Sequence, residues 1–275
     1  MFSILRIELL KLTSYSAFRV LIILHLVLFT LVIVTTSQLD ITVPGFSTDY
    51  LYQFPNVWEF FPWVASWFNI LLAILVIVIT GNEYNFRTFR QHVIDGLSRF
   101  ELLAGKGMVI VMLAVYATLM VLLLSLIFGF IFTRNYEEIS FAAKSYTLLV
   151  YFLQAVAYMV FGFFIAVLFR STGLAITLFL LYRLVIEPVI RLFFPKTVRL
   201  YFPVRAISDL TPTPEFVSIT KGNVQINGNE ADPLSLREAG ILPEKLPLLT
   251  DVLLTAGYTV LFIWLAYILL NKRNL

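Results

Sequence analysis

The sequence predicts an all-α integral membrane protein built from six transmembrane helices. Of its 275 residues, 60% are hydrophobic and 13% are charged, against about 45–50% and about 25% in soluble domains. The apolar residues form long continuous runs, without the alternation typical of a membrane β-barrel. This composition excludes a water-soluble enzyme and an intrinsically disordered chain. The absence of cysteine also excludes disulfides, thiol catalysis and thiolate metal sites.

Six apolar runs match the roughly 20 residues that a helix needs to cross a bilayer core of about 30 Å. We therefore expect a single transmembrane domain over 1–275. The expected spans lie at about 17–36, 60–81, 107–133, 145–169, 171–194 and 252–271.

An amphipathic helix is predicted ahead of the first span. Its apolar residues recur on one helical stripe, and its basic residues lie off that stripe, which favours a helix lying in the membrane interface. The alternative is a simple extension of the first span. The stripe consists of Phe2, Leu5, Leu9 and Leu12, with Arg6 and Lys11 beside it.

Basic residues near the span ends predict the orientation. The segment 37–59 contains no Lys or Arg, whereas the 82–106 loop and both chain ends are rich in them. Because basic residues are retained on the cytoplasmic side, we expect both termini to be cytoplasmic. The segment 195–248 then lies outside. Its first part is apolar and broken by prolines, which predicts short helices, and its second part predicts a hairpin around Lys221.

The loop 82–106 has the pattern of a short amphipathic helix, a sharp stop and a second helix. The residues Phe86, Phe89, Val93 and Leu97 fall on one helical stripe, and Gly96 is a natural helix terminator. Ser98 and Glu101 then have the spacing of a capping box, which would start the next helix.

This loop resembles the coupling-helix region of ABC type-2 permeases, the membrane subunits of ABC exporters. The matching positions are Glu83, Arg87-Thr88, the apolar stretch 89–94, Asp95 to Arg99, and Lys106. One departure is the turn, which often carries proline in the family and here reads Asp95-Gly96. The resemblance covers the whole chain as architecture, but only 81–106 as a motif.

The resemblance implies that two permease copies, or this chain and a homologous permease, form a substrate pathway. Each would dock on a separate ATP-binding subunit, which would hold ATP and Mg. The chain itself contains no P-loop and would bind no cofactor or metal. The alternative is a solvated helix whose arginines bind anionic membrane lipid. The implied docking residues are Glu83, Arg87, Thr88, Phe89, Arg90, Val93, Asp95, Gly96, Leu97, Ser98, Arg99 and Glu101.

Three charges interrupt the fifth span. Arg183, Glu187 and Arg191 recur every four residues and so share one helical face. Charges at that depth cost on the order of 2.5–3.5 kcal/mol each, so they should face protein or water. The sequence leaves two interpretations open: an Arg-Glu-Arg ladder that holds the bundle together, or a polar lining that contacts an anionic or amphipathic substrate. Pro188 should kink or end the helix.

The leading hypothesis is therefore a permease subunit of an ABC exporter in a bacterial cytoplasmic membrane. The chain would not be an enzyme, because ATP hydrolysis would belong to its partner, and nothing indicates nucleic-acid binding. A subunit that transmits force or signals without transport shares the same loop. A membrane-embedded enzyme is a third hypothesis, but the spans hold no paired His, Asp or Ser groups that would support it.

Overall fold

The computed structural model describes residues 8, 11–12, 15–39, 42–43, 46–86, 88, 91, 94, 96–133, 141, 143–214 and 245–272. Within these residues, six helical segments are long and apolar enough to cross a membrane. The prediction of a helical chain with six helices able to span a membrane is thus confirmed. The six segments are α2 (Ser16–Ser37), α4 (Val57–Asn85), α6 (Arg99–Phe132), α7 (Thr147–Phe169), the α8–α9 segment (Thr172–Leu192) and α12 (Leu248–Lys272).

Short elements join these helices. Between α2 and α4, β1 (Thr42–Val43) pairs antiparallel with β2 (Phe46–Ser47), and α3 (Thr48–Tyr52) follows. The fifth segment consists of α8 (Thr172–Leu181), the π-helical turn η1 (Tyr182–Ile186) and α9 (Glu187–Leu192). Two short helices come next, α10 (Lys196–Arg199) and α11 (Pro203–Asp209). They agree with the short helices expected there, whereas the hairpin expected around Lys221 lies outside the described residues.

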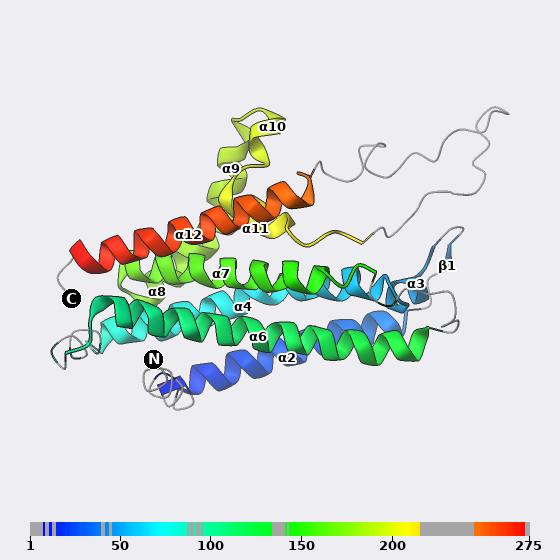
Figure 1. The fold of residues 1–275 in the computed structure, drawn as a ribbon, viewed down its shortest axis with the longest axis horizontal. Helices are drawn as coiled ribbons and strands as arrows, with labels where there is room; N and C mark the ends of the chain where they lie inside the picture. Colours follow the sequence, from blue (N-terminus) through cyan, green and yellow to red (C-terminus); the bar gives the residue numbers. More distant parts are fainter. Residues whose placement is uncertain are drawn as a thin grey trace.

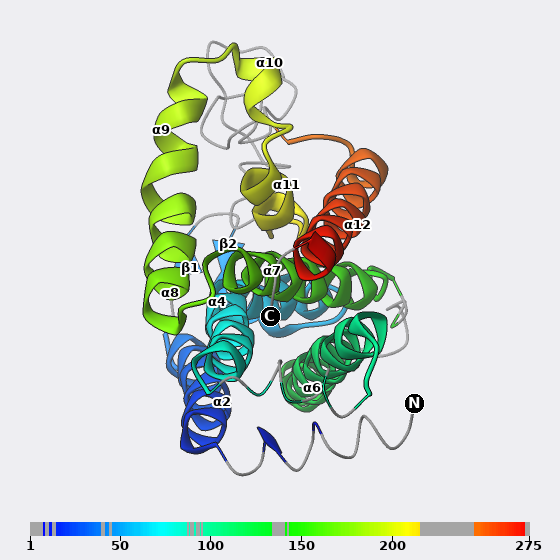
Figure 2. The ribbon, with the colours of Figure 1, turned by 90° about the vertical axis from the view of Figure 1, so that its left-hand side faces the viewer.

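Helices α4 and α7 form the centre of the bundle. In α4 and in α7, 67% of the apolar membrane-spanning stretch is buried inside the protein. The corresponding share is 17% in α2 and in the α8–α9 segment. Figure 2, which looks along the bundle, shows α2, α6, α8 and α12 around this central pair. Large apolar side chains such as Val20, Ile131 and Val260 remain exposed on the outer helices. Such faces suit contact with lipid tails rather than water.

Small residues allow the central helices to approach closely. A Cβ atom added at Gly162 of α7 would lie 3.0 Å from the carbonyl oxygen of Ala73 in α4. A Cβ atom added at Gly81 of α4 would lie 2.8 Å from the Cα atom of Thr172, at the start of α8. Both contacts follow the small-residue packing common between membrane helices.

The bundle has two distinguishable ends. The start of α2, the end of α4, the start of α6 and the end of α12 lie at the same end of the bundle (Figure 1). We call this the terminal end. The fifth segment is steeply inclined: in Figure 2, α8 and α9 run across the view, whereas α4, α6 and α12 are seen nearly end on.

Candidate functional site

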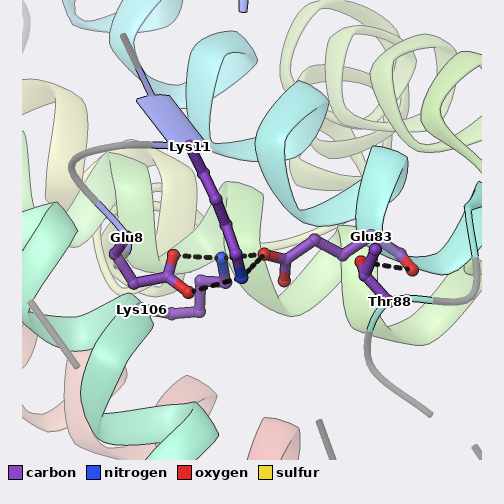
Figure 3. A network of polar contacts seen from close by, with 5 residues as sticks. All are labelled: Glu8, Lys11, Glu83, Thr88 and Lys106. Carbon is purple, nitrogen blue, oxygen red and sulfur yellow. Dashed lines mark hydrogen bonds and ion pairs between the residues drawn. The ribbon is translucent and has the colours of Figure 1, made fainter. Parts of the chain in front are cut away.

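A network of four charged side chains lies at the terminal end of the bundle (Figure 3). Lys106 of α6 donates to Glu8 Oε2 at 2.6 Å and to Glu83 Oε1 of α4 at 2.7 Å. Lys11 donates to Glu8 Oε1 at 3.1 Å and to the same Glu83 oxygen at 3.2 Å. Two lysines and two glutamates therefore balance each other and join three parts of the chain. We call these four residues the terminal charge network.

The terminal charge network is largely withdrawn from solvent. Glu83 is 2% exposed, Lys106 is 3% exposed and Glu8 is 6% exposed. Charges buried to this degree are tolerated only when each is closely paired, because desolvation opposes them. The network supplies such pairing to every carboxylate and ammonium within it.

The network keeps Glu8 and Lys11 charged over a wide pH range. Burial opposes the ionised form of Glu8, but Lys106 and Lys11 outweigh it, so the pKa of Glu8 falls below its ordinary value of 4.5. Burial likewise opposes the charged form of Lys11, but Glu83 and Glu8 outweigh it and raise its pKa above 10.5. Glu8 thus contributes stability that is present above pH 4.5 and is lost as pH falls through its lowered pKa. Lys11 contributes stability that is present below pH 10.5 and is lost as pH rises through its raised pKa.

The network holds both ends of the connection between α4 and α6. Glu83 comes from the last turn of α4, and Lys106 comes from the second turn of α6. Within the connection, Thr88 donates its hydroxyl proton to the carbonyl oxygen of Glu83 at 3.2 Å. The segment between these two helices is therefore anchored by the network at both of its ends.

Two local signals in this connection, the Gly96 stop and the Ser98 cap, are as the sequence predicts. Residues 88, 91 and 94 are helical. Gly96 has a φ of +94°, a left-handed conformation that suits glycine at a helix stop. The capping box is confirmed: Ser98 N donates to Glu101 Oε2 at 2.8 Å, and Glu101 N donates to Ser98 Oγ at 3.2 Å. The other expected docking residues, namely Arg87, Phe89, Arg90, Val93 and Asp95, lie outside the described residues.

Large apolar side chains in and beside this connection face outward. Phe86 is 69% exposed, Ile94 is 73% exposed and Phe100 is 65% exposed. Leu97 lies between them in sequence and is partly buried. Phe86, Ile94 and Phe100 are called the exposed apolar set below. Exposed apolar side chains of this size are typical of surfaces that contact another protein or a membrane.

Two of the expected docking residues are used inside the protein instead. Glu83 belongs to the buried network, and Arg99 donates to the carbonyl oxygens of Leu270, at 2.7 Å, and Asn271. The physical reason is that the last carbonyls of α12 lack helical partners and attract a cation. Both residues therefore tie the connection to the rest of the protein.

Replacing Arg99 with methionine is expected to loosen the last turn of α12. Two carbonyls lose a charged donor, and each such hydrogen bond is worth roughly 1.5–3 kcal/mol when shielded, less in this partly exposed site. Amide hydrogen exchange over 268–272 should accelerate by about tenfold. Arg99→Lys, which keeps the charge, should accelerate it less. Unchanged exchange in Arg99→Met would contradict this assignment.

The charges of the fifth segment do not form the predicted ladder. Glu187 is 1% exposed and accepts from the backbone N–H groups of Val204, at 2.9 Å, and Arg205, at 2.7 Å, in α11. Among the described side chains, the ion pairs do not include one between Glu187 and Arg183 or Arg191. The Arg183 guanidinium instead lies over the Tyr158 ring, 4.6 Å from its centroid. The unpaired backbone N–H groups at the start of a helix attract a carboxylate. Glu187 therefore binds to the start of α11 rather than to the two arginines.

Glu8 and Lys11 were not among the predicted site residues, and Lys106 was named only as a position of the motif. Their signal in the sequence is weak: each is a charge next to an apolar span, which is ordinary at a membrane surface. Only the fold brings Glu8 and Lys106 together, since 98 positions separate them. Within the described part of the chain, no three His, Asp or Glu side chains gather in a way that could hold a metal ion.

Neither a protein-family model nor a curated protein sequence matches the chain.

Proposed function

We propose that this chain is the permease subunit of an ABC exporter in a bacterial cytoplasmic membrane, with both termini in the cytoplasm. It couples to a separate ATP-binding subunit through the connection 82–101. The observation that carries the proposal is the exposed apolar set, which lies in and beside this connection. The terminal charge network anchors both ends of the connection. A solvated loop gains nothing from large outward apolar side chains, whereas a docking surface uses them as anchors.

The arrangement also supports force transmission. A partner that moves the connection pulls on Glu83 of α4 and Lys106 of α6 together, because the two side chains are joined at 2.7 Å. Helix α4 lies at the centre of the bundle against α7. A displacement at the terminal end is therefore delivered to the core helices, as an exporter driven by ATP requires.

The proposal is tested by purifying the tagged chain from its native membrane in mild detergent. We expect a P-loop ATPase to copurify, identified by mass spectrometry and by ATP hydrolysis. Ile94→Asp should reduce its yield at least tenfold, because a charge replaces an apolar anchor that is 73% exposed. The matched control is Gln91→Asp, an exposed position in the same segment that gains the same charge.

Two results would contradict the proposal. One is a chain that purifies with no ATPase at any detergent strength. The other is an ATPase that copurifies in full yield with both Ile94→Asp and Phe100→Asp. Because both side chains are exposed, neither change should disturb membrane insertion or the fold.

A further inference from the structure

A polar cavity of about 250 Å³ lies beside the two central helices. Its lining comes from α4, α7 and η1, from the end of α11, and from the irregular segments 210–214 and 245–247. Three charged side chains line it, and all three are partly exposed: Arg183, Asp209 and Lys245. What can fill a cavity with charges of both signs depends on its depth in the membrane.

The charged residues of α4 give this depth. Glu83 belongs to the terminal charge network, and Glu59, 24 positions away, pairs with Lys144 at 2.7 Å at the opposite end, which we call the far end. At 1.5 Å per residue the two glutamates are roughly 36 Å apart, just more than a bilayer core of about 30 Å. Ser66 lines the cavity and is seven positions from Glu59. The cavity therefore lies roughly 10 Å inside the far end.

Helix α7 places the cavity at the same depth. Gln154 is seven positions from Thr147, the first residue of α7. Its Nε2 donates to the carbonyl oxygens of Ile207, at 2.8 Å, and Ser208, at 3.1 Å, so the end of α11 reaches this depth too. In agreement, Figure 1 shows that α12 begins well short of the far end of α6.

Irregular backbone at this depth is informative. Lipid tails offer no hydrogen bonds, so non-helical chain within a membrane is found only where protein buries it or where it lines a water-filled cavity. Lys245 donates to the carbonyl oxygens of Asp209 and Thr211, both at 3.2 Å, and so fastens the two irregular segments together. Thr213 and Lys245 nevertheless stay partly exposed at the cavity, which favours water there.

The charged side chains also favour water over lipid. The Arg183 guanidinium lies over the Tyr158 ring, 4.6 Å from its centroid, and Asp209 pairs with Arg205. A charge in hydrocarbon costs on the order of 2.5–3.5 kcal/mol, and these contacts offset only part of that cost. Water solvates cations and carboxylates alike, so it suits a lining that carries both signs of charge.

The opposite side of the bundle is apolar at the same depth. The rings of Phe61 in α4 and Phe128 in α6 have their centroids 5.8 Å apart, so these two residues are level. Leu123, five positions from Phe128, is then level with Ser66, five positions from Phe61, and Leu123 is 58% exposed. Such a side chain suits lipid contact. The polar boundary of the protein therefore lies deeper on the cavity side than on the α6 side.

We propose that this cavity is a water-filled recess that opens at the far end and carries water and small hydrophilic solutes to the level of Ser66. Beyond the recess, 16 positions of α4 remain between Trp67 and Glu83, which is roughly 24 Å. The apolar barrier on this side is thus about a third shorter than the full length between the two glutamates, and a polar group crossing the bundle has an aqueous exit. The proposal goes beyond coupling to an ATPase and does not depend on it, because access to the recess is measured on this chain alone.

The test uses single cysteines, because the sequence contains none. Thr213→Cys and Ser66→Cys place a thiol in the lining with little change in size. Leu123→Cys is the matched control at the same depth on the lipid-facing side. Asp49→Cys, at an exposed position of α3 in the far-end connection, reports whether reagent reaches that end. The chain is kept in sealed membrane vesicles, and charged methanethiosulfonates of either sign, which do not cross the membrane, are added outside.

Intact-mass measurements give the rate of modification. In vesicles where Asp49→Cys reacts, Thr213→Cys should react at least tenfold faster than Leu123→Cys, because a thiol needs water to ionise to the reactive thiolate. Ser66→Cys should react more slowly than Thr213→Cys, since Ser66 is only 7% exposed, but still faster than Leu123→Cys. Both reagents should act, as expected for a lining that carries both signs of charge.

Three results would overturn the proposal. Protection of both lining cysteines while Asp49→Cys reacts fully would show a closed or dry cavity. Equal rates in Leu123→Cys and the lining variants would show that the depth assignment is wrong. Modification of the lining cysteines only after the vesicles are permeabilised would show that the cavity opens toward the terminal end. Because the two lining variants lie in different elements, misfolding of one leaves the other to decide.

Discussion

Lys106→Met is expected to lower the free energy of unfolding by roughly 3–5 kcal/mol, because it leaves buried carboxylates without their main cation. Lys106 is 3% exposed and bonds to both Glu8 and Glu83, whereas Lys11 is the more exposed lysine of the network. The matched change Lys11→Met should therefore destabilise less. Thermal and denaturant unfolding in one detergent, followed by circular dichroism, measures both variants.

A charge-balanced double variant tests the reason for this loss. Lys106→Met combined with Glu83→Gln removes one charge of each sign and leaves Glu8 paired with Lys11 at 3.1 Å. We expect it to recover a large part of the stability lost in Lys106→Met, because no net charge stays buried. Losses that simply add would show that the residues act independently, and the terminal charge network would then not be a unit.

The helices were predictable from the sequence because membrane insertion depends on local hydropathy. The first span, expected at about 17–36, is observed as Ser16–Ser37. The largest difference is at α6, which begins at Arg99 rather than near 107. Hydropathy places the start after the charges of Glu101 and Lys106, whereas the Ser98 cap starts the helix before them.

Only those parts of the candidate site that depend on residues close together in the sequence were predictable. The capping box of Ser98 and Glu101 depends on residues three positions apart and was predicted correctly. The partners of Glu83 and Arg99 lie in other helices, and no spacing rule connects Arg99 to Leu270, 171 positions away. The partner of Glu187 left no signal at all, since backbone N–H groups are identical in every residue except proline.

Glu187→Ala is expected to destabilise the protein by roughly 3–6 kcal/mol. The change removes the acceptor of two backbone N–H groups at the start of α11, and hydrogen bonds to a charged group are worth about 1.5–3 kcal/mol each. Glu187→Gln keeps one accepting oxygen and should cost about half as much. Unfolding in detergent gives the size of the loss, and amide exchange at 204–205 locates it.

Adding Arg183→Met separates this assignment from the ladder that sequence spacing suggested. A ladder predicts that removing Arg183 rescues Glu187→Gln, because the arginine would otherwise be buried without its carboxylate. With Glu187 bound to α11 and Arg183 over Tyr158, the two losses should instead add. Rescue of the stability of Glu187→Gln by Arg183→Met would instead support the Arg-Glu-Arg ladder.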